Sequence, residues 1–123
     1  MDGMISKPKV QEGVWLWLLK VLFGLVIAVL IAVHFIVNHL VASGGLLTYQ
    51  DVINYYKNPG VTAMEIVFLI FVVSHALMGT RSIILDLNPS EKILKFINWG
   101  MLILGSAAII YGIWLVQVIA ASR

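Results

Sequence analysis

A histidine, an arginine and an aspartate stand in one apolar stretch near the middle of the chain. His75 lies inside a segment long enough to cross a membrane, and Arg81 and Asp86 follow it. Ionisable groups are costly in hydrocarbon, so each one inside such a segment is a candidate functional residue. His34 stands in another long apolar run. Because the chain has no cysteine, two such imidazoles point first to haem iron, for which histidine is a common ligand.

The residues after His75 follow a helical spacing that suits a flat macrocycle. Gly79, Ser82 and Asp86 come four, seven and eleven positions later and share one helix face with His75. The missing side chain of Gly79 leaves room on that face. Arg81 lies off this stripe but nearer the membrane edge, where a guanidinium can pair with a haem propionate. The alternative is that His75 only hydrogen-bonds across a helix bundle, Arg81 sets the topology and Asp86 ends a helix.

The two histidines of the first apolar run differ in how well they are placed to bind haem iron. His34 lies deep in the run, and His39 is five residues further on, about 7.5 Å along a helix and about 140° around it. They cannot easily address one cofactor, so we take His34 as the ligand and His39 as a residue near the interface that could be solvated or could bind a propionate. Asn38, one turn after His34, shares its face. Lys20 lies on nearly the same face at the other membrane edge, where its ammonium could meet a propionate, contact a docked subunit or reach the headgroups.

The depth of the two candidate ligands favours two haems. His34 is fourteen residues beyond Lys20, about 21 Å, and His75 is eleven residues before Asp86, about 16 Å. If the two segments run antiparallel, the two imidazoles lie at different heights in the membrane. One haem held by both histidines stays open as an alternative.

Composition places the chain among integral membrane proteins. Of its 123 residues, 61% are hydrophobic and 11% are charged, whereas about a quarter are charged in soluble domains. The net charge of +2 gives no case for a nucleic-acid partner. With no cysteine, the chain has no disulfide framework, Cys-based zinc site or Cys-ligated iron–sulfur cluster of its own.

Hydropathy predicts an all-α membrane protein with three transmembrane helices. We expect an N-terminal segment over 1–13, spans over 14–42, 61–87 and 93–120, loops over 43–60 and 88–92, and a C-terminus at 121–123. The first loop should hold a short interfacial helix, because its tyrosines suit the headgroup level. In the second loop Asn88 is the expected helix cap, with Pro89 at the first helical position.

Lysine and arginine counts predict the orientation. Six of these residues lie on the side of the N-terminus and second loop, and two lie on the other side. The excess favours a cytoplasmic N-terminus and second loop, with the first loop and the C-terminus outside. We expect a multi-pass protein of the cell (inner) membrane. The first group is Lys7, Lys9, Lys20, Arg81, Lys92 and Lys95, and the second is Lys57 and Arg123.

The pattern His75-x3-Gly79-x-Arg81-x4-Asp86 resembles the second span of the membrane-anchor subunits of succinate dehydrogenase and fumarate reductase, respiratory complex II. The stretch 33–38, Val-His-Phe-Ile-Val-Asn, resembles the first span of the anchors that hold two haems. The resemblance covers nearly the whole chain. It implies a non-catalytic electron-transfer subunit that pairs with a second anchor subunit and docks an iron–sulfur subunit and a flavoprotein subunit in the respiratory chain.

The resemblance also implies roles for single residues. Each haem b would be shared between the two anchors, with His75 on the inner iron, His34 on the outer iron and Arg81 on a propionate. Asp86 matches an aspartate near the quinone pocket at the inner face. Related anchors often place a tyrosine next, where this chain has Leu87, so the partner subunits would provide most of the quinone contacts.

Two other functions remain open from the residues. One is a stand-alone small di-haem cytochrome b, which would normally need four ligand histidines where this chain has three, unless it forms a homodimer. The other is a structural subunit of another respiratory complex, whose histidines only pack.

Overall fold

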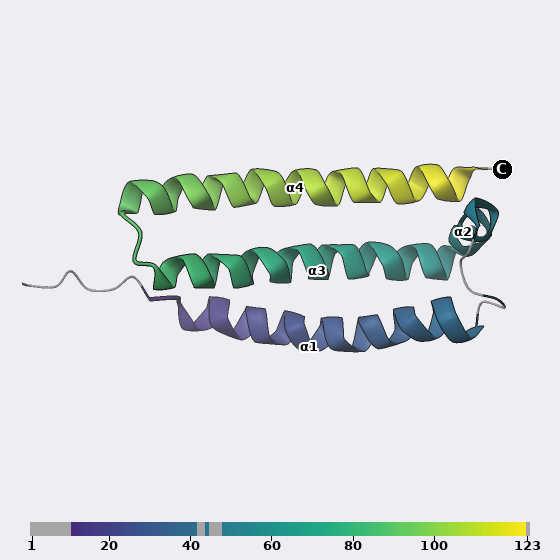
Figure 1. Cartoon of the computed structure of the whole chain (residues 1–123), viewed down its shortest axis with the longest axis horizontal. Coiled ribbons are helices and arrows are strands. Elements are labelled where there is room, and N and C mark those ends of the chain that lie inside the picture. The colour runs from purple at the N-terminus through teal and green to yellow at the C-terminus, as the bar shows by residue number, and fades with distance from the viewer. Residues whose placement is uncertain (1–10, 42–43, 45–47, 123) are drawn as a thin grey trace, which may run out of the picture.

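Three long apolar helices and one short polar helix form the protein in a computed structural model that describes residues 11–41, 44 and 48–122 (Figure 1). Helix α1 spans Val14–Ile36 and continues as a π-helical turn, η1, over Val37–Val41. Helix α2 spans Tyr49–Tyr56, α3 spans Pro59–Asp86 and α4 spans Glu91–Ala121. The described part is therefore all-α, as predicted, with the short helix between the first two spans.

Each long helix is long and apolar enough to cross a membrane. Relative to the predicted spans, α3 begins two residues earlier, and α4 extends beyond its span at both ends. The predicted N-terminal segment up to residue 10, with Lys7 and Lys9, lies outside the described residues. So do residues 42–43 and 45–47 of the first loop, and Arg123.

Side-chain caps fix where the helices begin. Thr48 and Asp51 form a reciprocal capping box at α2, and the Asn58 side chain accepts from the Gly60 N–H at 2.9 Å at the start of α3. The Ser90 hydroxyl accepts from the Ile93 N–H at 3.4 Å and caps α4. These caps satisfy N–H groups that have no partner within the first helical turn.

The prediction that Asn88 caps the third span is wrong. Asn88 has a φ of 51°, the left-handed conformation that asparagine tolerates better than most residues, and it follows the last turn of α3. It therefore helps to end α3, and Ser90 is the cap of the next helix.

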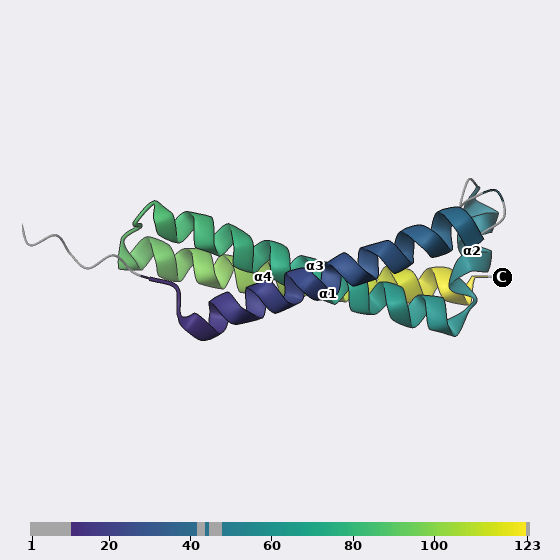
Figure 2. The same ribbon diagram turned by 90° about the horizontal axis from the view of Figure 1, so that it is seen from below.

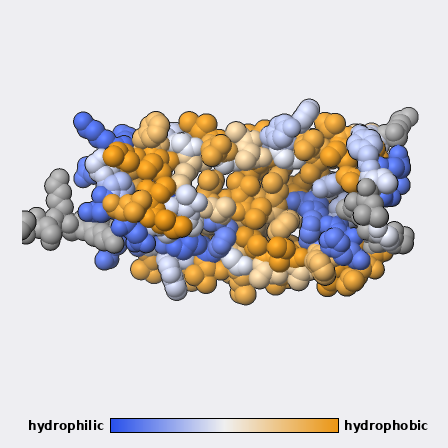
Figure 3. All heavy atoms as spheres, viewed as in Figure 1, coloured by the Kyte–Doolittle hydropathy of each residue, from blue (hydrophilic) through white to orange (hydrophobic). Residues whose placement is uncertain are grey.

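Helix α3 lies between α1 and α4 and packs against both (Figure 1). Figure 2 shows α1 crossing the other two helices at an angle. Within the described residues the backbones of α1 and α4 do not approach each other, so the long helices form an open layer and not a closed bundle. Few side chains are buried, and Figure 3 shows hydrophobic residues over most of the visible face, with hydrophilic residues gathered towards the two ends.

Two glycines allow α3 and α4 to pack closely. A Cβ at Gly105 would overlap the Leu77 side chain, and one at Gly112 would overlap Leu69. Small residues at such positions let membrane helices approach and gain van der Waals contact. The α3–α4 pair is therefore held by close packing of leucines against bare backbone.

This packing can be tested with a matched pair of substitutions. Gly105→Leu should lower the free energy of unfolding by about 1–3 kcal/mol, the usual cost of overpacking a filled interface. Gly100→Leu on the same helix is the control, because no atom of the described chain lies within 4 Å of a Cβ at Gly100. Unfolding of the purified complex in a denaturing detergent titration measures both. Equal stability of the two variants would contradict the packing.

Candidate functional site

His75 is held between α3 and α1 by a main-chain contact. Its Nδ1 lies 3.1 Å from the carbonyl oxygen of Lys20. Because a carbonyl only accepts, this contact favours the tautomer in which Nδ1 carries the hydrogen and Nε2 has a lone pair. The ring also lies against Gly24, where a Cβ would come within 3.0 Å of Cε1. Metal-binding histidines commonly have this arrangement, in which one nitrogen donates to a carbonyl and the other faces the metal.

The helix face next to His75 is partly open. No described atom lies within 4 Å of where a Cβ of Gly79 would stand, one turn after His75. The chain itself therefore does not fill the space that the sequence pattern predicted at this glycine.

Asp86 is the last residue of α3, and it is exposed.

A charged cluster joins the start of α1 to the end of α3. The Lys20 ammonium donates to Glu12 Oε2 at 2.7 Å and to Ser82 Oγ at 2.6 Å. The Ser82 hydroxyl in turn donates to Glu12 Oε1 at 2.7 Å. The hydrogen bond from Lys20 lowers the pKa of the Glu12 carboxyl, and burial opposes that shift. Lys20 thus contacts His75 through its backbone and Ser82 through its side chain.

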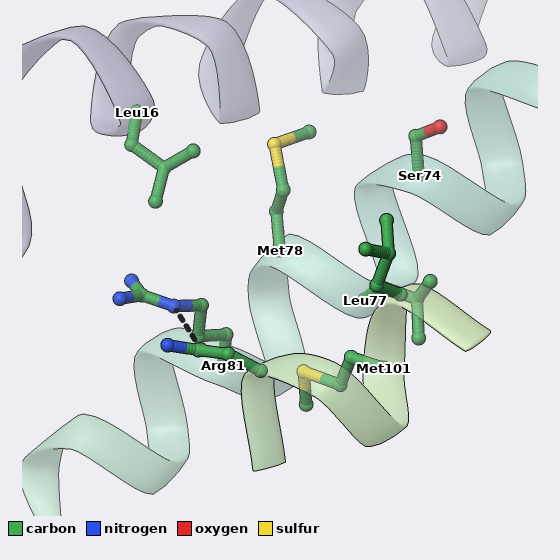
Figure 4. Close-up of a pocket in the computed structure, with 8 residues that line it drawn as sticks. Leu16, Ser74, Leu77, Met78, Arg81 and Met101 are labelled. Carbon is green, nitrogen blue, oxygen red and sulfur yellow. Dashed lines mark hydrogen bonds between the residues drawn. The ribbon is translucent and has the colours of Figure 1, made fainter. Parts of the chain in front are cut away.

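Arg81 faces the other way, towards α4. Its Nε donates to Asn98 Oδ1 at 2.9 Å, beside an open groove of about 270 Å³ (Figure 4). Apolar side chains from all three long helices make most of the groove wall. Its lining residues are Leu16, Ser74, Leu77, Met78, Arg81, Asn98, Met101 and Leu102. The structure therefore places His75 and Ser82 towards α1 and Arg81 on a different side of α3, as the helical spacing implied.

A second polar cluster surrounds His34 towards the opposite end of the molecule. His34 Nδ1 lies 2.8 Å from Glu65 Oε1, and the Tyr55 hydroxyl donates to the same oxygen at 2.5 Å. The Asn38 amide nitrogen lies 2.9 Å from His34 Nε2. Asn38 and Glu65 are 6% and 8% exposed, whereas the His34 side chain is 34% exposed, so the cluster is only partly buried within the chain. Burial, and then the neighbouring Glu65 carboxylate, raise the pKa of Tyr55 well above its ordinary value, which keeps the phenol a donor.

His39 lies apart from this cluster. It is exposed in the π-helical turn, and its ring lies tilted by 43° against that of Phe35 at a centroid distance of 4.9 Å. His34 and His39 therefore have different surroundings although they are five residues apart.

Sequence reasoning missed three members of these clusters. Glu65 carried a usable signal, since it is an ionisable residue within a membrane-length segment. The sequence pattern indicates Tyr55 only as an aromatic residue at the headgroup level. Glu12 stands outside the spans, and nothing in its sequence context indicates that it folds back onto Lys20 and Ser82.

The described residues form no larger cluster of metal-ligating side chains around either candidate ligand. Among residues 11–41, 44 and 48–122, no three His, Asp or Glu side chains gather as a metal-binding group. The resemblance implies that a haem held by His75 or His34 would take a further histidine from a second anchor subunit.

The fold and the two polar clusters define a multi-pass membrane subunit of three helices. A family model for the succinate dehydrogenase/fumarate reductase transmembrane subunit matches residues 4–113. The chain is also 32% identical over 92 residues to the succinate dehydrogenase hydrophobic membrane anchor subunit of Archaeoglobus fulgidus, an alignment that covers 75% of this chain and 77% of that protein. The chain belongs to this family and is a membrane anchor of a succinate dehydrogenase or fumarate reductase. No solved structure is significantly similar to it.

The Glu12 contacts predict a particular pH dependence of stability. Because the folded-state pKa of Glu12 lies below the ordinary 4.5, its stabilising contribution is complete above pH 4.5 and disappears as the pH falls through the folded-state value. Glu12→Gln should cost about 0.5–1 kcal/mol at neutral pH and flatten the loss of stability on acidification. The unfolding temperatures of the unchanged protein and of Glu12→Gln, measured from neutral pH to below pH 4.5, test the effect. Parallel curves would contradict it.

Proposed function

We propose that this chain is the haem b-binding anchor of a succinate:quinone oxidoreductase. The observation that carries the proposal is the hydrogen bond between His75 Nδ1 and the Lys20 carbonyl, which leaves Nε2 as the nitrogen for iron. Bound haem would supply one-electron transfer between the iron–sulfur clusters, quinone and the membrane interior. The residues fit this group because His75 has the required tautomer and Gly79 leaves open space one turn away.

His34 is the proposed ligand of a second haem. Its Nδ1 is fixed by Glu65, so Nε2 is again the nitrogen for iron. The Asn38 amide contacts that nitrogen in this structure and would have to turn aside. Asn38 Oδ1 has no hydrogen-bond partner among the described residues. Turning the amide would therefore break no hydrogen bond at its oxygen.

The open helix layer supports a paired anchor. With α3 between α1 and α4 and little side-chain burial, both faces of the layer remain uncovered within the described chain. A second anchor subunit would cover one face and bring a further histidine to each haem. The N-terminal end, with the excess of lysine and arginine, would face the cytoplasm and dock the iron–sulfur and flavoprotein subunits.

The remaining candidate residues take roles at the membrane edges. Arg81 would bind a propionate of the inner haem from the groove in Figure 4, with the Lys20 and Ser82 pair close to the His75 side. Asp86, at the exposed end of α3, would assist proton delivery to a quinone at the inner face. His39 would serve a propionate near the opposite face.

Optical spectroscopy of the complex with its partner subunits tests this proposal. A reduced-minus-oxidised spectrum should show two b-type haems per copy of this chain. His75→Ala and His34→Ala should each remove one haem, because alanine has no ligand atom, while the chain stays in the membrane. Tyr111→Ala, which removes an exposed ring from α4, should keep both haems.

Other outcomes would overturn parts of the proposal. An unchanged haem content in His75→Ala would exclude it as a ligand, and a complex with no haem would return both histidines to a packing role. A haem-containing complex built only from copies of this chain would identify a stand-alone cytochrome b.

A further inference from the structure

The second span contains a buried carboxylate, that of Glu65, and its position inside the membrane needs a physical explanation. Glu65 is 8% exposed and is the seventh residue of α3. A carboxylate in hydrocarbon is expensive unless donors satisfy it. Here two groups meet one oxygen, Oε1: the imidazole Nδ1 of His34 from α1 and the hydroxyl of Tyr55 from α2. Three helices therefore converge on one atom.

We propose that Glu65 is a positioning residue that sets the tautomer and the electron-donating strength of His34. The inference rests on the proposed role of His34 as a haem ligand. Because a carboxylate only accepts, the contact at 2.8 Å fixes the hydrogen on Nδ1 and turns Nε2 into the nitrogen with the lone pair. A carboxylate partner also makes an imidazole a stronger electron donor to its metal.

The two candidate ligands differ in the charge of the group that orients them. The partner of His75 is a neutral carbonyl, that of Lys20, and the partner of His34 is a carboxylate. A more strongly donating ligand favours ferric over ferrous iron and lowers the reduction potential. Glu65 therefore separates the potentials of the two haems, by holding the His34 haem at a lower value than a carbonyl partner would.

Tyr55 moderates this effect. Its hydroxyl donates to the same Oε1 that receives the His34 hydrogen, so it draws negative charge away from that contact. Removing this hydroxyl leaves the carboxylate a stronger acceptor for His34. The two neighbours of His34 are thus expected to act on its iron in opposite directions, which a purely packing role would not produce.

Redox titration of the purified complex tests the proposal. The haem that His34→Ala removes is followed by its optical bands as the potential is varied. Glu65→Gln should raise the midpoint potential of that haem, since an amide oxygen accepts the hydrogen more weakly. Tyr55→Phe should lower it. Neither should move the haem that His75→Ala removes. Tyr49→Phe is the matched control, because it removes a hydroxyl from the same helix at a residue that is 70% exposed and has no hydrogen bond to Glu65.

The haem content of variants in which His34 loses its orienting acceptor gives a second measurement. Glu65→Leu removes the acceptor, so the His34 haem should be depleted while Glu65→Gln retains it. Opposite potential shifts, with rescue by glutamine, would support the proposal even where the leucine variant fails to assemble.

A failure of the ligand role of His34 can be distinguished from a failure of the positioning role of Glu65. If His34→Ala keeps both haems, or if the complex holds no haem, the ligand role of His34 fails and this inference falls with it. If His34→Ala removes a haem but the Glu65→Gln and Tyr55→Phe shifts are absent or share one sign, the ligand role stands and the positioning role of Glu65 is overturned.

Discussion

The interface between α1 and α3 depends on one constraint: polar groups in hydrocarbon must find partners within the protein. Two sets of hydrogen-bonded groups lie along this interface: Lys20 and Ser82, joined by Glu12 from outside the spans, at one end, and His34, Asn38 and Glu65 at the other. Each set contains members from both sides of the interface, so neither helix can satisfy its polar residues alone. The pairing of α1 with α3 is thereby specified by hydrogen bonds, whereas the pairing of α3 with α4 rests on leucines packed against Gly105 and Gly112.

Sequence patterns were sufficient to predict the three membrane-spanning helices and part of the candidate site. Apolar runs of membrane length predict the three spans directly, because the bilayer sets their length. Helical spacing also brings His75 and Ser82 to one face, and both contact Lys20 in the structure. The partners across helices were not accessible in this way. Nothing in the periodicity of one helix states which residue of another lies opposite, so the contacts of Glu12 and Glu65 emerge only from the fold.

The second loop shows the same limit at smaller scale. Asn88, Pro89 and Ser90 each suit a helix boundary, and residue preferences alone allow more than one register for the cap. The left-handed conformation of Asn88 decides between them, since it ends α3 and leaves Ser90 to begin α4. Such a choice depends on how the two helices must turn to lie side by side.

The main-chain nature of the His75 contact has a consequence for how this anchor can change over time. Every residue has a carbonyl, so position 20 can drift in side chain without His75 losing the acceptor that orients it. His34 has no such protection, because its acceptor is the side chain of Glu65 and a single codon change can remove it. The orientation of one imidazole is thus robust to substitution, whereas that of the other depends on a single side chain.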